Sequence, residues 1–370
     1  MKIRPLAVAI LTLGTLGAAN TAVAETTMEA RIAELERQLE ALKSQVATNQ
    51  ETVVAAQTEM QADIEEARPS KPGTKFQYGG YIQLDAITTD YGEGKPGNDL
   101  IEDFLVPSLI PTGSGGSDSY PSTGLHAKTS RFFFTTKTDT DAGAISTRVE
   151  LDFMLSGSGD ERISNSWSSR IRHAFVNWDY APGSSLMAGQ SWSTFFNVGA
   201  LPDVLDFVGP VGTLFVRQPQ VRWTMGGLQL AVENPATRLN QDSGGSLSTS
   251  FDDFHEGIPD LVARYNGKMG DLGWSVAGLV RELAYEQRSS AGVEEDSDSQ
   301  MVYGLSFAGK WMFGDDDLRF MVNYGDGLGR YLGLNAFNDG YVTDSGDIET
   351  IDQFGAFIAY RHYWSPRWRS

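Results

Sequence analysis

The stretch Ile145–Leu155 reads ISTRVELDFML and decides the fold, because its side chains alternate strictly in character. The odd positions are apolar or threonine, and Ser146, Arg148, Glu150 and Asp152 stand between them. Successive side chains of a β-strand point to opposite faces of a sheet. The stretch therefore predicts a strand with one apolar face and one wettable face.

The same alternation continues from residue 75 onward and predicts about twelve strands. They start near residues 75, 126, 143, 170, 184, 213, 227, 258, 271, 301, 317 and 353. Very short gaps alternate with long ones, and the long gaps cover residues 88–125, 156–169, 194–212, 234–257, 284–300 and 332–352. Tight turns at one end and long loops at the other are typical of an antiparallel outer-membrane β-barrel. A large β-solenoid or propeller is the alternative.

The first 24 residues predict a secretory signal peptide. Lys2 and Arg4 precede an apolar run, Leu6–Ala19, and a small-residue cleavage site that ends at Ala24. The run is shorter than the roughly 20 residues that span a bilayer, which disfavours a single-pass anchor. We therefore expect export from the cytoplasm and cleavage after Ala24.

Residues 25–67 predict a periplasmic α-helical coiled coil, because apolar residues recur every seven positions. The two heptad positions are filled by Met28, Leu35 and Leu42, and by Ile32, Leu39, Val46, Val53 and Met60. A lone amphipathic helix on a surface is the alternative, but the polar face is mixed in charge rather than basic. Residues 68–74 contain two prolines and a glycine, which predict a stiff linker before a barrel at residues 75–370.

Composition disfavours several other classes of protein. The sequence has no cysteine, so it holds no disulfide, thiolate metal site or cysteine nucleophile. Its formal net charge of −19 argues against nucleic-acid binding. We predict no cofactor and no metal, because the metal-ligand types in Asp252–Glu256 lie in a polar loop, where such residues are usually solvated.

The chain stops at Arg367–Ser370, just after a turn. Closing a bacterial barrel requires an even number of strands and no free edge. We therefore expect the sequence to lack the last strands of the full protein. A complete barrel of twelve strands followed by a tail is the alternative.

The order of these parts resembles the DcaP-like family of trimeric outer-membrane porins. The segments that carry the resemblance are GGYIQLD at 79–85, SRFFF at 130–134, RHAFV at 172–176, GQSWSTF at 189–195 and RQPQVRW at 217–223. The resemblance implies a sixteen-stranded barrel, a homotrimer and passage of small anions such as dicarboxylates and aromatic acids. Phosphate-selective porins carry a similar coiled coil and are the closest rival. The sequence departs from the family pattern in lacking an aromatic C-terminal strand.

The polar faces of the strands predict a basic channel lining. The candidate pore-lining and anion-binding residues are Arg131, Lys137, Arg148, Arg222, Arg264, Arg281, Lys310, Arg319 and Arg361. The acids on the same faces are Asp85, Glu150, Asp152, Asp260 and Asp317. A ring of guanidinium groups favours anions, although each arginine by itself could be an ordinary solvated wall residue. Arg170 and Arg172 share the parity of an apolar face and are left out of the pore.

The segment 195–207 is too apolar for a loop that lies in water. We predict that it folds into the barrel as a constriction loop. Its candidate residues are Phe195, Phe196, Asp203, Asp206 and Phe207. Latching over a neighbouring subunit is the alternative.

These features predict a non-enzymatic porin of the bacterial outer membrane, with no catalytic residues, that passes small hydrophilic solutes and favours anions. Its expected partners are membrane lipid, lipopolysaccharide, further copies of the chain in a homotrimer and small anionic solutes, with peptidoglycan a candidate for the coiled coil. A general or phosphate-selective porin, a barrel enzyme and a structural cell-wall anchor are the alternatives. Only four histidines are present, and none has an evident acid–base partner in the sequence.

Overall fold

The computed structural model describes most of the chain after residue 72. The described residues are 73–96, 103–106, 110–113, 119–155, 167–242, 247–251, 257–288, 294–333 and 337–370, together with Arg37, Glu40 and Lys43. The chain divides into two compact units, residues 1–71 and 72–370. The predicted signal peptide lies outside the described residues, as do most of the predicted coiled coil and linker; Arg37, Glu40 and Lys43 are helical.

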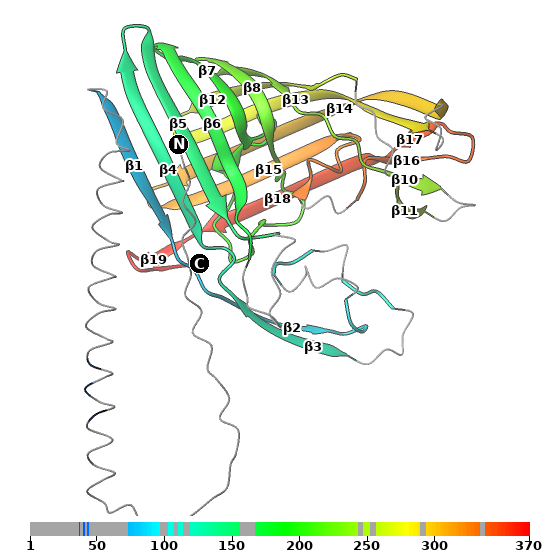
Figure 1. The fold of residues 1–370 in the computed structure, drawn as a ribbon, viewed down its shortest axis with the longest axis horizontal. Coiled ribbons are helices and arrows are strands. Elements are labelled where there is room, and N and C mark those ends of the chain that lie inside the picture. The colour runs from blue at the N-terminus through cyan, green and yellow to red at the C-terminus, as the bar shows by residue number, and fades with distance from the viewer. Residues whose placement is uncertain are drawn as a thin grey trace, which may run out of the picture. The chain divides into compact units, whose positions relative to one another are not determined.

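Twelve strands form one large antiparallel sheet in the second unit. In sheet order they are β1 (Thr74–Tyr81), β4 (Arg131–Thr140), β5 (Gly143–Asp152), β6 (Arg170–Ala181), β7 (Ser184–Trp192), β8 (Arg217–Met225), β9 (Leu228–Glu233), β12 (Asp260–Met269), β13 (Leu272–Arg288), β14 (Glu294–Phe313), β15 (Asp316–Asp326) and β18 (Asp352–Arg361). The sheet curls strongly, so that β15 and β18 pass behind β5 and β6 (Figure 1). Between described residues, no pairing of β1 with β18 closes the sheet.

Tight turns and longer connections alternate along this sheet, as the sequence predicts. Each turn after β4, β6, β8, β12 and β14 leaves two residues between the strands. The predicted long gap at 284–300 was wrong, because β13 and β14 continue to Arg288 and Glu294 and remain paired up to that point. Their outer ends are rich in polar residues and resemble a loop in sequence, but strand pairing satisfies the backbone while polar side chains face water.

Smaller elements lie in the long connections. β2 (Asp85–Tyr91) pairs with β3 (Tyr120–His126), and the 3-10 helix η3 (Val198–Ala200) lies between β7 and β8. A four-stranded sheet consists of β10 (Leu239–Asp242), β11 (Leu247–Phe251), β16 (Gly340–Val342) and β17 (Ile348–Thr350). After β18, a hairpin is formed by β19 (Tyr363–Ser365) and β20 (Trp368–Arg369). Leu239, Val342 and Ile348 share a buried cluster with side chains of β13 and β14. No helix in the described part of the chain is long and apolar enough to cross a membrane.

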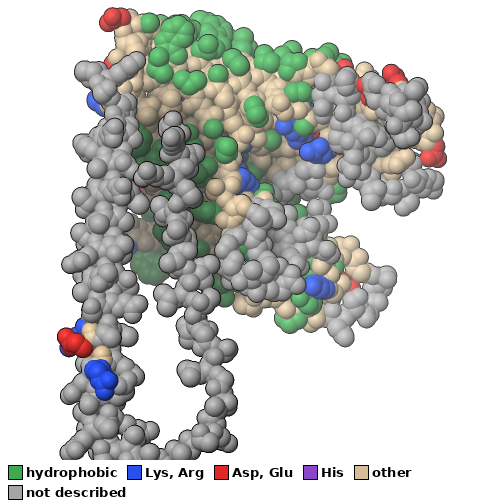
Figure 2. All heavy atoms as spheres, in the orientation of Figure 1, with side chains coloured by type: hydrophobic (Ala, Val, Ile, Leu, Met, Phe, Trp, Pro, Cys, Tyr) green, Lys and Arg blue, Asp and Glu red, His purple; other side chains and the backbone are tan. Residues whose placement is uncertain are grey.

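The outer face of the large sheet carries exposed apolar side chains. Those between 38% and 55% exposed include Val149, Val176, Leu186, Val221, Leu230, Leu261, Val276, Val280, Leu305 and Val322. Hydrophobic side chains gather on this surface at the top of Figure 2, over the β4–β5 and β6–β7 turns of Figure 1. An apolar face of this extent is not expected to face water.

Aromatic rings form a band where the strands meet the tight turns. The band consists of Trp178, Tyr180, Trp223, Tyr265, Trp274, Trp311, Phe313 and Tyr360. The ring centres of Trp178 and Tyr180 lie 5.4 Å apart, and the Trp223 Nε1 donates to the Tyr180 hydroxyl at 2.7 Å. Rings with a polar atom suit a boundary between apolar and aqueous surroundings.

Gly189 of β7 allows a close approach between strands, and we expect its replacement by alanine to destabilise the sheet. Its φ is +128°, and an added Cβ would lie 2.3 Å from the carbonyl oxygen of Ala174. Gly189→Ala should therefore cost about 1–3 kcal/mol, measured as a lower urea midpoint in detergent micelles. Gly278→Ala is the matched control, because no atom lies within 4 Å of its Cβ position. Equal midpoints for the two variants would contradict this expectation.

Candidate functional site

The connection between β7 and β8, residues 193–216, folds onto the inner face of the sheet, and we call it the inner loop. Phe195, Phe196 and Leu214 are almost fully buried in one cluster with inner-face side chains of five strands. Those side chains are Ala231, Val262, Ala277, Leu279, Ala308 and Met321. The loop also reaches the edge strand β18, because a Cβ on Gly212 would lie 2.6 Å from the backbone nitrogen of Ala356. The inner loop therefore crosses the inner face from β8 to β18.

Hydrogen bonds hold the inner loop along its length. They run from Thr194 N to Glu233 Oε1 (2.6 Å), from Arg264 Nη1 to Phe196 O (2.7 Å), from Asn197 Nδ2 to Ser275 Oγ (2.8 Å), from Arg319 Nη1 to Leu201 O, and from Asn323 Nδ2 to Gly212 O (2.9 Å). A hydrogen bond from a charged guanidinium is about twice as strong as a neutral one. Arg264 and Arg319, both predicted as pore-lining cations, are thus used to position the loop.

Residues 202–208 form the projecting part of the inner loop, with Asp203, Val204 and Leu205 exposed and Val208 buried with Phe104, Val106 and Met154. Leu205 is fully exposed, and Val204 is about half exposed. The Asp206 carboxylate holds this segment in place, because it accepts hydrogen bonds from the backbone nitrogens of Leu105 at 2.8 Å and Val208 at 3.0 Å. Leu205 is thus the most exposed large hydrophobic residue of a loop that is otherwise well anchored.

A cavity of about 540 Å³ lies between the inner loop and strands β4–β7. Its walls include Arg131, Arg148, Arg172 and Glu150, with Phe207 on the loop side. Glu150 accepts from Arg148 at 2.5 Å and from Arg172 at 2.8 Å, and it lies 3.4 Å from Arg131. The cavity therefore has more cations than acids.

Arg170 and Arg172 lie on the inner face, which corrects their exclusion from the pore side. Both guanidinium groups donate to Asp152, at 2.8 Å and 2.7 Å. The pairing of β5 with β6 shifts between Glu150 and Leu151, so that Arg172 and His173 are both buried although they are consecutive. A β-bulge of this kind reverses the parity of every later side chain. A single bulge thus separates the inward arginines from the outward side chains of Ala174, Val176, Trp178 and Tyr180, which have the same sequence parity.

Two pairs of like charges face each other across neighbouring strands near the tight turns. Lys75 pairs with Lys137, and Lys310 pairs with Arg319. Asp317 lies 2.7 Å from Arg319 and 3.9 Å from Lys310, and it also contacts Arg361. Neither Lys75 nor Lys137 has an ion pair with a described residue. Sequence reasoning missed Lys75, although it alternates with the outward Phe76 as the other inner cations do with their neighbours.

Arg281 occupies a different setting, a buried network that joins β12, β13 and the connection between β15 and β18. Its side chain is 0% exposed, and its guanidinium lies 3.1 Å from Asp339 and 3.5 Å from Asp260. It donates to the carbonyl oxygen of Gly327 at 3.1 Å, and the Tyr331 hydroxyl donates to Asp260 at 2.5 Å. A solute cannot reach Arg281 in this structure, so we remove it from the candidate pore-lining set.

A sequence profile of the DcaP outer membrane protein family matches residues 12–370. The chain belongs to this family. The crystal structure of the outer membrane channel DcaP of Acinetobacter baumannii has a TM-score of 0.60 at 22% identity, covering 81% of this chain and 77% of that chain. OmpT of Vibrio cholerae in its trimer form has a TM-score of 0.26 at 14% identity, covering 79% of this chain and 100% of that chain. A search of curated proteins found no match.

The remaining predicted residues of this DcaP family protein fall into two groups. Arg131 and Arg148 line the cavity beside Glu150, whereas Lys137, Arg222, Lys310 and Arg361 lie on the inner face nearer the tight turns. Their role in anion passage stays a prediction. Among the described residues, no three acidic or histidine side chains gather as metal ligands would, and Asp252–Glu256 lie outside them.

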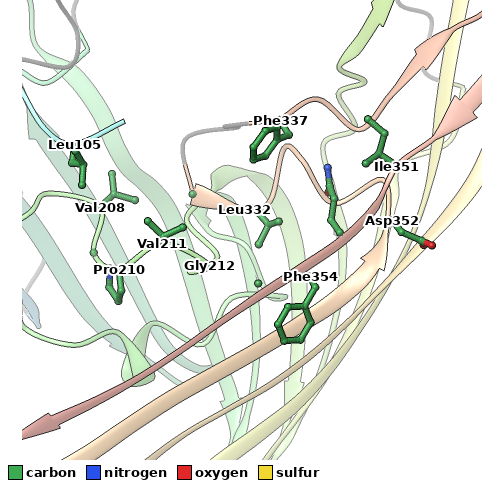
Figure 3. Close-up of a pocket in the computed structure, with 14 residues that line it drawn as sticks. Leu105, Val208, Pro210, Val211, Gly212, Leu332, Phe337, Ile351, Asp352 and Phe354 are labelled. Carbon is green, nitrogen blue, oxygen red and sulfur yellow. The ribbon is translucent and has the colours of Figure 1, made fainter. Parts of the chain in front are cut away.

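A second cavity of about 340 Å³ lies where the inner loop of this DcaP family protein meets β18. Figure 3 shows Val211 and Gly212 of the loop, Leu332 from the connection after β15, and Phe354 of β18 around it. The lining is mainly apolar, and its one charged residue is an acid, Asp352. This cavity offers no cation for an anionic solute, which leaves the arginine-lined cavity as the candidate site.

Proposed function

We propose that this protein is a porin whose sheet forms the wall of an outer-membrane barrel, with the outer face against lipid. The outer face of β14 supports this placement, because the exposed rings of Tyr303 and Phe313 lie ten positions apart along the strand. At about 3.3 Å per residue this is about 33 Å of strand, or about 25 Å after a tilt of about 40°. That height equals the apolar band of outer-membrane barrels, roughly 25 Å between two aromatic girdles.

The inner face would then enclose the water-filled passage, and the inner loop would narrow it. Phe195 and Phe196 anchor the loop in the apolar cluster, while Asp203, Asp206 and Phe207 lie in or beside its projecting part. Phe207 faces the arginine-lined cavity. The narrowest part of the passage would thus have the inner loop on one side and the arginines of β4–β6 on the other.

We further propose that the passage favours anions, and the like-charged pairs carry this proposal. Like charges directly opposite each other on neighbouring strands destabilise a sheet. Two such pairs, Lys75 with Lys137 and Lys310 with Arg319, lie on the same inner face. Asp317 offsets the repulsion between Lys310 and Arg319. Lys75 and Lys137 have no ion pair with a described residue, so a wall needed only for structure would gain stability by losing that pair. A wall that attracts anions needs both pairs, because one unit charge contributes only about 1 kcal/mol at contact in water.

Neutralising one lysine of each pair should reduce the preference for anions. In a KCl gradient across a planar bilayer, we expect the reversal potential of the wild-type protein to have the sign that indicates a preference for anions. Lys137→Gln combined with Lys310→Gln should lower the anion-to-cation permeability ratio severalfold. Lys95→Gln is the control for charge, because Lys95 is exposed beside Tyr120 and away from the inner face. Cation preference in the wild type, or an unchanged ratio in the double variant, would defeat the proposal.

The identity of the anion and the assembly complete the proposal. Dicarboxylates and aromatic acids are the solutes that the family resemblance implies, and phosphate is the rival. Blocking of KCl current by succinate, phthalate and phosphate in competition would rank them. The working assembly would be a homotrimer in lipid and lipopolysaccharide, exported by the signal peptide, with residues 25–67 in the periplasm and peptidoglycan as their candidate contact.

A further inference from the structure

The two ends of the large sheet differ in charge. At the end away from the tight turns, the tips of β13 and β14 and the β16–β17 hairpin are acidic. Their acids are Glu282, Glu286, Glu294, Asp296, Asp298, Asp344, Asp347 and Glu349. Between 282 and 288, 294 and 301, and 340 and 350, Arg288 is the one basic residue. These segments are therefore strongly negative. Arg131, Arg170, Arg172 and Arg217 also lie at this end of the large sheet, the loop end, where Glu150 and Asp152 pair with three of them.

The inner face near the tight turns is basic. The cations there are Lys75, Lys137, Arg148, Arg222, Arg264, Lys268, Lys310, Arg319 and Arg361. The acids on the same part of the face are Asp139, Asp179 and Asp317. The turns add Asp141, Asp271 and Asp315 at the rim, which reduce the positive charge but leave cations in excess.

We propose that the channel rectifies, conducting ions better when the loop end is at positive potential; this rests on the proposed porin function. Fixed acids enrich mobile cations at the loop end, and fixed bases enrich mobile anions at the turn end. A positive potential at the loop end drives both kinds of ion toward the middle, so the passage fills with carriers. The opposite potential draws both away from the middle and depletes it.

The effect depends on screening, which separates it from a moving gate. The Debye length is about 10 Å at 0.1 M salt and about 3 Å at 1 M. At 0.1 M the charges of each end act across the width of the passage, whereas at 1 M they act only at contact. The ratio of currents at opposite voltages should therefore exceed unity at 0.1 M KCl and approach unity at 1 M.

The same change of charge at the two ends should have opposite effects. Asp344→Asn, Asp347→Asn and Glu349→Gln together make the loop end less acidic and should lower the current ratio. Asp141→Asn, Asp271→Asn and Asp315→Asn together make the turn end more basic and should raise it. All six side chains are exposed, so neither triple variant disturbs the buried core.

The experiment uses the full chain in single-channel recordings in neutral-lipid bilayers. The chain has no cysteine, so biotin on Ala142→Cys in the β4–β5 turn marks one end, and streptavidin added to one chamber identifies the side it faces. A channel with equal currents at both voltages in 0.1 M KCl would overturn the rectification. So would rectification that persists in 1 M KCl, or equal shifts in both triple variants. Complete lack of conductance would instead overturn the porin function itself.

Discussion

Deleting residues 202–208 is expected to raise the single-channel conductance severalfold. The deletion removes the projecting part of the inner loop, including the fully exposed Leu205. It leaves the anchors of Phe196 and Leu201 in place, because Arg264 holds Phe196 and Arg319 holds Leu201, and it removes the buried Val208. A Gly-Gly linker joins the two ends, since a Cβ on Gly209 would lie 3.0 Å from the Leu201 side chain.

The matched control keeps the length of the loop and changes its character. Replacing 202–208 by seven glycine and serine residues retains a chain across the passage but removes Phe207 and the apolar side chains. We expect a smaller rise in conductance than for the deletion, with noisier open-channel current because the segment loses its packing. Unchanged conductance in the deletion variant would remove the constriction role and favour a contact with a neighbouring subunit.

Arg281→Met is expected to give the largest loss of stability of any single substitution proposed for this chain. Removing one partner of a buried ion pair costs about 3–5 kcal/mol, because the other charge stays buried without compensation. Here the variant removes the guanidinium from Asp339 and one of two from Asp260, which keeps Arg330 at 3.4 Å. Urea unfolding in detergent micelles, followed by tryptophan fluorescence, should show a much lower midpoint.

Two further variants test whether the loss of stability comes from the buried acids left behind or simply from the loss of a cation. Lys310→Met removes a cation that is 34% exposed and 3.9 Å from its acid, so its cost should be no more than about 1 kcal/mol. Adding Asp260→Asn and Asp339→Asn to Arg281→Met removes the stranded charges and should recover part of the stability. A cost for Arg281→Met equal to that of Lys310→Met would contradict the expected role of the network.

The fold of the large sheet could be predicted from sequence because alternation and turn spacing are local signals. Predicted strand starts agree with the structure to within five residues, except that β14 begins seven residues early, at Glu294. That error arises because β14 before Met301 carries polar side chains on both faces, while the tip of β13 buries Leu283 and Tyr285 against the small four-stranded sheet. Alternation of apolar and polar residues arises where one face of a strand contacts apolar surroundings. Parts of a strand that extend beyond those surroundings lack the alternation and are not predicted from it.

The site could be predicted only in part. Alternation placed Arg148 and Lys310 on the inner face, next to the exposed and outward Val149 and Trp311, and Lys137 on the same parity as Arg131 of β4. It failed for Arg172, because a bulge adds a residue without any mark in the sequence. It also could not show that Arg319 would hold a loop, because that contact joins residues 118 positions apart.

The most direct test of the central claim compares water access to neighbouring positions of one strand. Because the chain has no cysteine, each position of β4 can carry the only thiol. In proteoliposomes, cysteines at Thr135 and Lys137 on the inner face should react quickly with a charged, membrane-impermeant maleimide. Cysteines at Phe134 and Thr136 on the outer face should stay protected and be reached by a lipid-attached spin label. Equal labelling at all four positions would contradict a sheet with water on its inner face and lipid on its outer face.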